Sequence, residues 1–438
     1  MSRYKAYPEY KNSGLQWLGE MPSHWVLRKS KYVFNRVQRE VRPDDGVVTA
    51  FRDGQVTLRS NRRTEGFTES IKEIGYQGVR KGDLLVHAMD GFAGAIGVSD
   101  SDGKCSPVCS VCVPTDQEQV HVAYFGYLVR QLAVTDFISS LAKGIRERST
   151  EFRYSEFSVL DLALPPQNEQ VDISTFLDHE TAKIDALIEK QQRLIELLKE
   201  KRQAVISHAV TKGLNLNAPM KDSGVEWLGE VPAHWEVKRL KNTSQIIDCR
   251  NKTPEYFEDG EYFVIRTTNV KNQVLTMADA LFTDERNFKI WTQRGVPPAG
   301  SILFTREAPA GEVCLVPEDV KFCLGQRMMN FICHDSEYTE FLFDFLISDC
   351  LEKYIESVSH GSTVSHLRVE QVENIPVVLP PAHEVKQIYA VLAELKSRFS
   401  ELTKKAEEAI LLMQERRTAL ISAAVTGKID VRAWQAAA

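Results

Sequence analysis

The sequence predicts an α+β protein in which two globular mixed α/β domains are separated by two long helices packed as an antiparallel coiled coil, with a pseudo-two-fold internal repeat. Three observations lead to this prediction. The chain of 438 residues is too long for one ordinary core. A leader segment occurs twice. Each leader is followed by a globular stretch and then by a long segment without Gly or Pro.

The leader reads KNSGLQWLGEMPSHW at 11–25 and KDSGVEWLGEVPAHW at 221–235, and ten of these fifteen positions are identical. The offset of 210 residues is the size of a domain, so it indicates duplication of a whole unit and not a short solenoid repeat. Further matching segments are 82–100 with 300–318, 144–166 with 361–381, 164–170 with 379–385, and 200–213 with 414–428. The two copies are similar in their leaders and helix ends but differ in the bodies between them. This is expected if each body recognises a different target; the alternative is that the bodies drifted apart after duplication.

The two bodies are predicted to be mixed α/β. Alternating apolar runs bounded by Gly and Pro predict strands at 83–89, 106–114, 262–268 and 301–306. Apolar residues at helical spacing predict helical segments at 121–142 and 338–358.

Each body leads through a Pro-Pro pair into a long helix, predicted from Gln167 to about Ala209 and from His383 to about Val425. Apolar residues three and four apart indicate a coiled-coil seam, and Gly213 and Gly427 supply the ends. The seam and partner-docking candidates are Leu187, Leu194, Leu198, Leu395, Phe399 and Leu402. The nearest partner for one helix is the other copy; the alternative is that each helix packs on its own body.

These elements give five predicted regions. They are a first globular domain with its leader (1–166), a central long helix (167–213), a second globular domain with its leader (214–381), a C-terminal long helix (382–428), and a tail (429–438).

Composition excludes several classes of protein. The chain is 43% apolar and 26% charged, which is typical of soluble globular proteins. It has no apolar run of about 20 residues and no signal-like start, so we expect a cytoplasmic protein without membrane contact. The net charge of −6 excludes coating of polyanions by bulk charge, so any nucleic-acid contact must use local basic patches.

No motif for catalysis or for a metal is found. The sequence has no GxxxxGK[ST], HExxH or GxSxG motif, and no Pro-Pro pair has the Asp/Asn-Pro-Pro-aromatic form of amino-methyltransferases. On a strand, Cys109 and Cys112 point to opposite faces and Cys105 lies about 13 Å from Cys109, so no metal site is expected. His24 and His234, which precede the repeated tryptophans, are expected to have structural roles.

Local charge points towards nucleic acid. Residues 28–63 hold ten basic side chains against four acidic ones, and the loop before the first Pro-Pro pair is also basic. Basic and hydroxyl side chains beside glycines suit contact with phosphates and base edges, although a solvated charged loop is the simpler alternative. The candidate DNA-binding residues are Arg52, Lys143, Arg146 and Arg148 in the first body and Arg266, Asn269, Arg306, Ser365 and Arg368 in the second.

Together these features resemble the specificity (S) subunits of type I restriction-modification systems. The resemblance covers essentially the whole chain. It rests on the leader KxSGxxWLGExPxHW, the Pro-Pro junctions, the EKRxAxISxAVTKG-like helix ends, and the order of body then helix occurring twice. It implies two target-recognition domains, each reading one half of a bipartite, asymmetric site in double-stranded DNA, with the helices acting as spacer.

The resemblance also implies which chemistry lies outside this chain. Two methyltransferase (M) subunits would dock on the helices, bind S-adenosylmethionine and methylate a flipped adenine. Restriction (R) subunits would add ATP- and Mg-dependent translocation and cleavage. This chain would then hold no cofactor and no catalytic residue. Two alternatives stay open: a self-contained DNA methyltransferase or nuclease with an unrecognised active site, and a coiled-coil adaptor without a DNA role.

Overall fold

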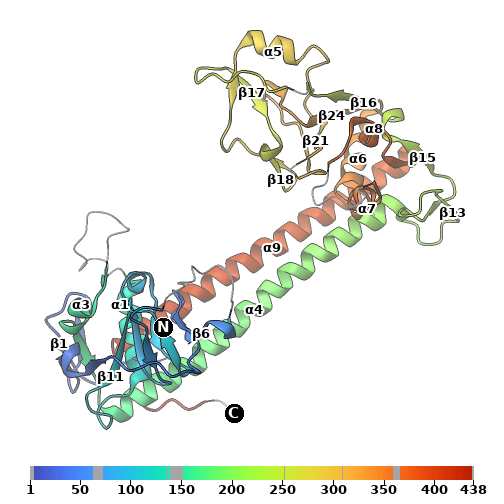
Figure 1. The fold of residues 1–438 in the computed structure, drawn as a ribbon. Helices are drawn as coiled ribbons and strands as arrows, with labels where there is room; N and C mark the ends of the chain where they lie inside the picture. Colours follow the sequence, from blue (N-terminus) through green and yellow to red (C-terminus); the bar gives the residue numbers. More distant parts are fainter. Residues whose placement is uncertain are drawn as a thin grey trace. The chain divides into compact units, whose positions relative to one another are not determined.

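The computed structural model describes residues 4–62, 73–135, 137–138, 151–250, 252–307, 309–358 and 366–436 (Figure 1). The chain forms two compact units. Unit 1 comprises Met1–Gln191 with Glu408–Ala438, and unit 2 comprises Gln192–Glu407. Each unit holds one globular body and a part of both long helices, α4 (Gln167–Lys212) and α9 (Ala382–Val425).

Unit 1 is built around a four-stranded antiparallel sheet of order β4-β11-β8-β9. Its elements outside the long helices are β1 Tyr10–Asn12, β2 Glu20–Pro22, β3 Val26–Lys29, β4 Phe34–Val37, β5 Val48–Ala50, β6 Val56–Leu58, β7 Gln77–Val79, β8 Leu84–His87, β9 Ile96–Val98, β10 Gly103–Cys105, β11 Cys109–Pro114, α1 Val122–Val134, α3 Tyr154–Ser158 and β12 Asp161–Leu164. Leu84 and Cys112 face one apolar cluster and Leu85 and Val111 face another, because successive strand residues point to opposite sides.

Unit 2 repeats this sheet in the order β16-β24-β21-β22. Its elements outside the long helices are β13 Met220–Asp222, β14 Glu230–Pro232, β15 Glu236–Arg239, β16 Ser244–Asp248, β17 Tyr262–Ile265, β18 Val270–Lys271, β19 Val274–Leu275, β20 Phe282–Thr283, α5 Glu285–Trp291, β21 Ile302–Thr305, β22 Val313–Leu315, β23 Phe322–Leu324, β24 Met328–Cys333, α6 Thr339–Leu346, α7 Asp349–Val358, α8 Val369–Glu373 and β25 Pro376–Leu379. The repeated segments at 82–100 and 300–318 therefore form equivalent strand pairs, β8-β9 and β21-β22. In each pair the first strand is an inner strand of the sheet and the second is its edge strand.

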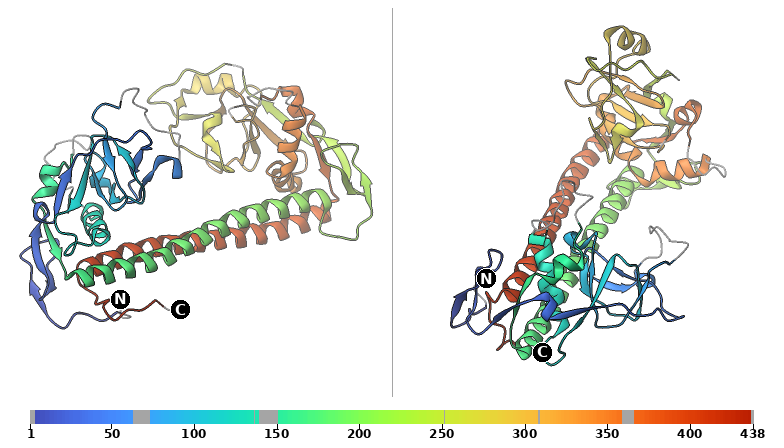
Figure 2. Two further views of the ribbon diagram at one scale, coloured as in Figure 1. Left: turned by 60° about the horizontal axis from the view of Figure 1, so that its bottom comes forward. Right: turned by 60° about the vertical axis from the view of Figure 1, so that its left-hand side comes forward.

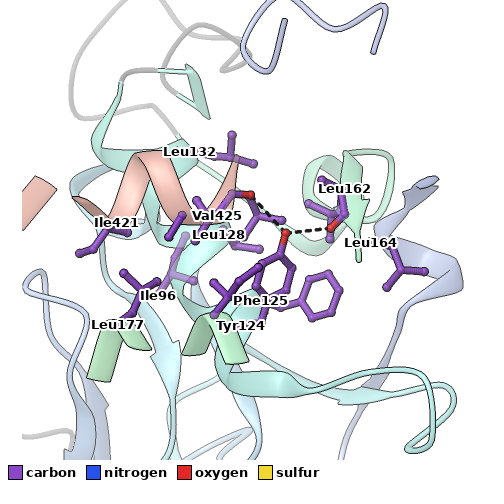
Figure 3. Packing of buried hydrophobic residues seen from close by; sticks show 14 of the residues in the cluster. Ile96, Tyr124, Phe125, Leu128, Leu132, Leu162, Leu164, Leu177, Ile421 and Val425 are labelled. Carbon is purple, nitrogen blue, oxygen red and sulfur yellow. Dashed lines mark hydrogen bonds between the residues drawn. The ribbon is translucent and has the colours of Figure 1, made fainter. Parts of the chain in front are cut away.

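In unit 1 the first half of α4 and the last half of α9 lie side by side beneath the body (Figure 2). Tyr124 on α1 lies at the centre of this packing, with its hydroxyl within hydrogen-bond distance of the Ala163 and Val425 carbonyls (Figure 3). An ion pair between Asp185 Oδ1 and Arg417 Nε, 2.8 Å apart, joins the two helices beside this core. Burial of the apolar sides of both helices fixes their pairing within the unit.

In unit 2 the last half of α4 and the first half of α9 share a second core, with Ile206 and Val210 on α4 and Ile388 and Leu392 on α9. Lys396 on α9 donates to Asp344 on α6 at 2.8 Å, which ties the helix to the body. The body's own helices thus cover the same stretch of α9 that α4 packs against. Within each unit the two long-helix segments run in opposite directions, because the start of one meets the end of the other.

Three of the six predicted seam residues are exposed in the structure. Ile184 is 6% exposed in unit 1, whereas Leu187 is 50% exposed. Leu194 and Leu402 are also exposed, while Leu198, Leu395 and Phe399 are half-buried. Leu187, Leu194 and Leu402 therefore do not line the intramolecular seam; they stay candidates for partner docking only. The reason is that both helices carry more apolar residues per heptad than one seam can bury.

The repeated leader connects the two long helices within unit 1. Trp25 donates its indole N–H to Glu169 Oε1 at 3.0 Å in the first turn of α4, and His24 Nε2 lies 2.8 Å from Oε2 of the same carboxylate. The other side of the Trp25 ring packs against Gly427, which has φ 71° just after α9. A glycine in this left-handed conformation ends a helix without steric cost.

Unit 2 has the same arrangement, but there the tryptophan contacts the start of α9 and the end of α4. Trp235 donates to Glu384 Oε2 at 2.9 Å in the first turn of α9, and His234 Nε2 lies 2.5 Å from Oε1. The Trp235 ring packs against Gly213, with φ 75°, just after α4. The structural role expected for the His-Trp pair is thus to join the start of one long helix to the end of the other.

The segment predicted as a tail is part of the core of unit 1. Ile429 and Val431 are buried, and the Asp430 N–H donates to the Lys5 carbonyl at 2.8 Å. Trp434 packs edge-on against Phe176 of α4, with ring centroids 5.4 Å apart. The two ends of the chain therefore complete one apolar cluster together.

Candidate nucleic-acid interface

The two bodies share one backbone feature, which we call the strand-end edge. In unit 1 it joins the residue after β8 with the residue before β11: the Ala88 N–H donates to the Val108 carbonyl at 2.8 Å, and the Ala88 carbonyl accepts from the Phe152 N–H at 2.7 Å. The strands themselves pair His87 with Cys109. Phe152, which closes this edge, follows in the sequence the basic segment singled out above.

Unit 2 has the same edge. The Arg306 N–H donates to the Arg327 carbonyl at 2.9 Å, and the Arg306 carbonyl accepts from the Leu367 N–H at 3.0 Å. The strands pair Thr305 with Met328, the counterpart of His87 with Cys109. The backbone is thus the same at both edges, while the side chains on it differ.

Arg52 lies at the strand-end edge of unit 1 and is well exposed. Its Nη2 donates to Asp90 Oδ1 at 2.7 Å, and the Asp90 N–H donates to His87 Nδ1 at 2.9 Å. Burial lowers the pKa of His87, so its imidazole is neutral near pH 7 and can accept this hydrogen bond. The arrangement presents one cation with a fixed carboxylate partner at the surface.

The basic stretch 28–63 is less basic in the structure than its sequence suggests. Four of its arginines pair with carboxylates, most of which lie further along the chain, and the ion pairs are Arg39–Asp83, Arg42–Asp102, Arg52–Asp90 and Arg62–Asp53. Counting charge within a window misses these partners. The stretch is therefore partly an internal ion-pair network and not a continuous basic patch.

Four predicted contact residues, Lys143, Arg146, Arg148 and Ser365, lie outside the described residues. The residues that follow those loops are described. Arg153 and Arg368 are both exposed and occupy matching places, as the N-cap residues of α3 and α8. This match supports the correspondence of the two loops that the sequence repeat indicates.

In unit 2, Asn269 and Arg306 are buried. The Asn269 side chain accepts from the Arg266 N–H at 3.0 Å and donates to the Thr276 and Ala278 carbonyls, so it is fully used inside its own turn. Arg306 lies between the Leu367 carbonyl and the Cys249 thiol. Neither side chain presents an edge to a base; both hold local backbone in place. Arg266 is half-buried, and its Nη2 donates to the Asp279 carbonyl at 2.6 Å.

The cysteines are arranged differently from our expectation. Residues 106–108 form a turn and not a strand, so β11 begins only at Cys109. The Cys105 thiol lies near that of Cys109, and this contact together with burial raises the pKa of Cys109. The predicted separation of about 13 Å is therefore wrong. Within the described ranges, no three His, Cys, Asp or Glu side chains gather as metal ligands.

A cavity of about 650 Å³ lies in unit 1 between α1 and the ends of the long helices. Part of its polar lining is paired: Arg417 with Asp185, and the Tyr127 hydroxyl with Asp178 at 2.7 Å. No Ser, Cys or His is among the described residues that line it. Separately, none of the described helices combines the length and apolar composition that crossing a bilayer requires.

Comparison with known proteins gives a consistent picture. The chain is 22% identical over 433 residues to a protein of Methanocaldococcus jannaschii named as the MjaX type I restriction enzyme specificity subunit, covering 95% of this chain and 96% of that one. It is 21% identical over 451 residues to the type I restriction enzyme EcoKI specificity subunit of Escherichia coli K12, covering 95% and 92%.

Two solved structures share the fold. The HsdS subunit from Thermoanaerobacter tengcongensis matches with a TM-score of 0.54 at 16% identity, covering 93% of this chain and 98% of that one. A chain from a type I R-M system structure matches with a TM-score of 0.61 at 16% identity, covering 92% and 98%. Residues 232–412 match the type I restriction modification DNA specificity domain. Over nearly its whole length the chain is therefore similar to specificity subunits of type I restriction-modification systems.

Proposed function

We propose that this chain is the DNA-recognition subunit of a type I restriction-modification complex, and that each unit reads one half of a bipartite, asymmetric site. Recognition of a DNA sequence is the role of its family. The observation that carries the bipartite reading is the duplicated sheet, in which strand order and register are the same in both units. A repeated backbone with different side chains suits two related readers of different sequences.

The proposed DNA contacts lie near the strand-end edges. They are Arg52, Lys143, Arg146, Arg148 and Arg153 in unit 1, and Arg266, Ser365 and Arg368 in unit 2. Exposed arginines suit phosphates and guanine edges, whereas the hydroxyl of Ser365 suits either a phosphate or a base. Asn269 and Arg306 are proposed to position the loops that carry these contacts.

The long helices are proposed to pair as one antiparallel coiled coil that sets the spacing between half-sites and docks methyltransferase subunits. Exposed leucines support the docking. Unit 1 presents Leu187 and Leu412, and unit 2 presents Leu402 and Leu197. Each pair matches the other at an offset of 215 residues, the offset of the repeated helix starts. Two equivalent apolar positions on exchanged helices support two M subunits, one at each unit.

The chemistry is proposed to belong to the partners. S-adenosylmethionine would bind the M subunits, and ATP with Mg would bind the R subunits, so that this chain supplies recognition and assembly. The rival proposal of a self-contained enzyme makes a different prediction. The purified chain alone, incubated with S-adenosylmethionine and DNA, would transfer methyl groups if the rival were true; we expect no transfer until M subunits are added.

An Arg52→Gln variant tests the assignment of the DNA-binding surface. In the assembled complex with M subunits, we expect about tenfold weaker binding to the cognate duplex and a salt slope reduced by about one, because one cationic contact is lost. Arg193→Gln, which removes an exposed, ion-paired arginine on α4, is the matched control and should leave both quantities unchanged. Equal binding by wild type and Arg52→Gln would contradict the assignment, and binding without sequence preference by the wild type would favour the adaptor.

A further inference from the structure

We infer that three matched positions at the strand-end edge determine which bases each unit selects. The first position is the second residue after β8 or β21, and the second is the residue just before the paired strand, β11 or β24. The third is the residue just before Phe152 or Leu367, whose N–H donates to the carbonyl of Ala88 or Arg306. In unit 1 these positions hold Met89, Val108 and Glu151, and in unit 2 they hold Glu307, Arg327 and His366. The inference rests on the proposed function and goes beyond it by naming the residues and the chemistry of the bases they select.

The match between the positions comes from the backbone and not from sequence similarity. Ala88 and Arg306 each make the same two backbone hydrogen bonds, and the residues at the three positions are their neighbours or partners. Because both edges have the same backbone hydrogen bonds, the three side chains project from equivalent backbone positions in the two units. They are nevertheless chemically unlike: two of the three are apolar in unit 1, whereas all three are ionic or ionisable in unit 2. Substitutions at these three positions can therefore change which bases are selected without changing the fold.

In unit 2 the three side chains form one ionic cluster. Arg327 Nε lies 2.7 Å from Glu307 Oε2, and the His366 imidazole contacts Oε1 of the same carboxylate. Glu307 is 16% exposed, whereas the Arg327 side chain is 47% exposed. The carboxylate thus holds the guanidinium through Nε, and the structure records no partner for its two terminal nitrogens among the described residues. A guanidinium fixed in this way can donate two hydrogen bonds to O6 and N7 of guanine.

The backbone at Arg327 also points to a role beyond stability. Its φ of 70° lies in the left-handed region, which is strained for a residue that carries a side chain. The conformation is held by its N–H, which donates to the Cys249 thiol at 3.1 Å, and by its carbonyl at the strand-end edge. Because the Arg327 side chain is 47% exposed, its ion pair adds little to stability. The strained, exposed Arg327 is therefore explained better by a contact with a ligand than by a contribution to the stability of the fold.

Unit 1 presents an apolar group at the corresponding place. Met89 is 51% exposed, Val108 is half-buried, and Glu151 is paired with Arg153. An exposed thioether beside the Arg52–Asp90 pair suits contact with the C5-methyl group of thymine. We therefore assign a guanine-containing position to the half-site of unit 2 and a thymine-containing position to the half-site of unit 1.

The test is a selection of duplexes from a randomised library by the assembled complex with its M subunits. Arg327→Gly should lose the preference for guanine at one position of one half-site by about 5- to 150-fold, while the other half-site is unchanged. Glycine adopts a positive φ without strain, so this variant should fold at least as well as the wild type. Arg327→Lys should keep affinity but lose most of the preference, because an ammonium cannot pair bidentately.

Met89→Gln should change one position of the opposite half-site from thymine towards adenine. Lys289→Gln, which removes an exposed, ion-paired lysine on α5, is the control and should change no base preference. Unchanged preferences in Arg327→Gly, or changes by both variants in the same half-site, would overturn the inference while leaving the proposed function intact. Absence of any base preference in the wild-type complex would instead overturn the proposed function.

Discussion

Glu169 accepts hydrogen bonds from three side chains, those of Tyr7, His24 and Trp25, at the first turn of α4. It is 2% exposed. Burial and the contact with Glu169 raise the pKa of Tyr7, so its hydroxyl stays protonated and remains a donor. A carboxylate at a helix N-terminus is also stabilised by the helix dipole. The equivalent Glu384 has two such donors and is 23% exposed.

Substitution of these carboxylates should destabilise the two units unequally. We expect Glu169→Ala to cost about 3–5 kcal/mol, because it leaves buried donors unpaired, and Glu384→Ala to cost about 1–2 kcal/mol. Hydrogen exchange of the amides in the first turns of α4 and α9 measures each effect locally, which avoids assuming two-state unfolding of the whole chain. Equal loss of protection in the two variants would contradict the explanation.

At the residue scale the sequence predicted roles better than partners. The repeated His-Trp pair could be assigned a structural role, but its partner Glu169 lies 145 residues from His24, which no local pattern reveals. The same limit applies to Arg52, whose partner Asp90 lies outside the basic window that singled it out. Glu307 and Arg327 were not predicted at all. Their only sequence signal is that each occupies a position matched to a different residue type in the other repeat.

At the scale of elements, the long helices expose one leucine stripe while burying another. Ile184 and Leu187 are neighbours on α4 in unit 1, yet one is buried and the other is half exposed. We expect Ile184→Ala to destabilise unit 1 by about 2–4 kcal/mol and Leu187→Ala by less than about 1 kcal/mol. Urea unfolding followed by helical circular dichroism, with exchange data to locate the change, measures this difference.

The same pair separates folding from docking. Leu187→Ala should weaken binding of M subunits about tenfold, since burial of a leucine contributes about 1.5–3 kcal/mol. Ala186→Ser, on the exposed side of the same turn, is a matched control without a large apolar group. If Leu187→Ala binds M subunits as the wild type does, this side of α4 is not the docking surface.

Heptad spacing predicted that the long helices exist and where they end, but not which stripe faces inwards. With several apolar residues in each heptad, two rotations of the helix bury similar area, and the body decides between them. The segment 338–358 shows another limit: its apolar pattern is continuous, but the structure divides it into α6 and α7 around Ile347 and Ser348. The Ser348 hydroxyl donates to the Phe345 carbonyl at 2.6 Å, which is a local turn bond that periodicity does not report.

At the scale of the whole molecule, the duplication was the strongest prediction because it needed no partner information. Two copies of one leader at domain-sized offset predicted two bodies and two long helices. The sequence did not predict that residues 429–436 would pack into unit 1, since a short segment after a long helix was expected to be a free tail. Trp434 was the available signal, because an exposed tryptophan at a chain end is rarely left without a contact.

Adding one heptad to both long helices tests the proposed spacing role. Insertion of seven residues after Gln191 and after Ala406, which correspond in the repeat, lengthens each helix by about 10 Å and keeps the apolar register. We expect the gap between half-sites to grow by about three base pairs, with both half-site sequences unchanged. Mapping methylated adenines in cells that carry the variant complex measures the gap. An insertion in α4 alone should destabilise the helix pair, and an unchanged gap in the double insertion would contradict a spacing role.

Because unit 1 contains both Met1–Gln191 and Glu408–Ala438, the ribosome makes most of it first but supplies its final strand contacts and Trp434 last. Unit 2 is a single continuous stretch and can finish folding during synthesis. The body that is made first must therefore wait, with Phe176 uncovered by Trp434, until residues 408–436 have been made. A stop codon placed before Ile429 would then harm the first-made domain and spare the second.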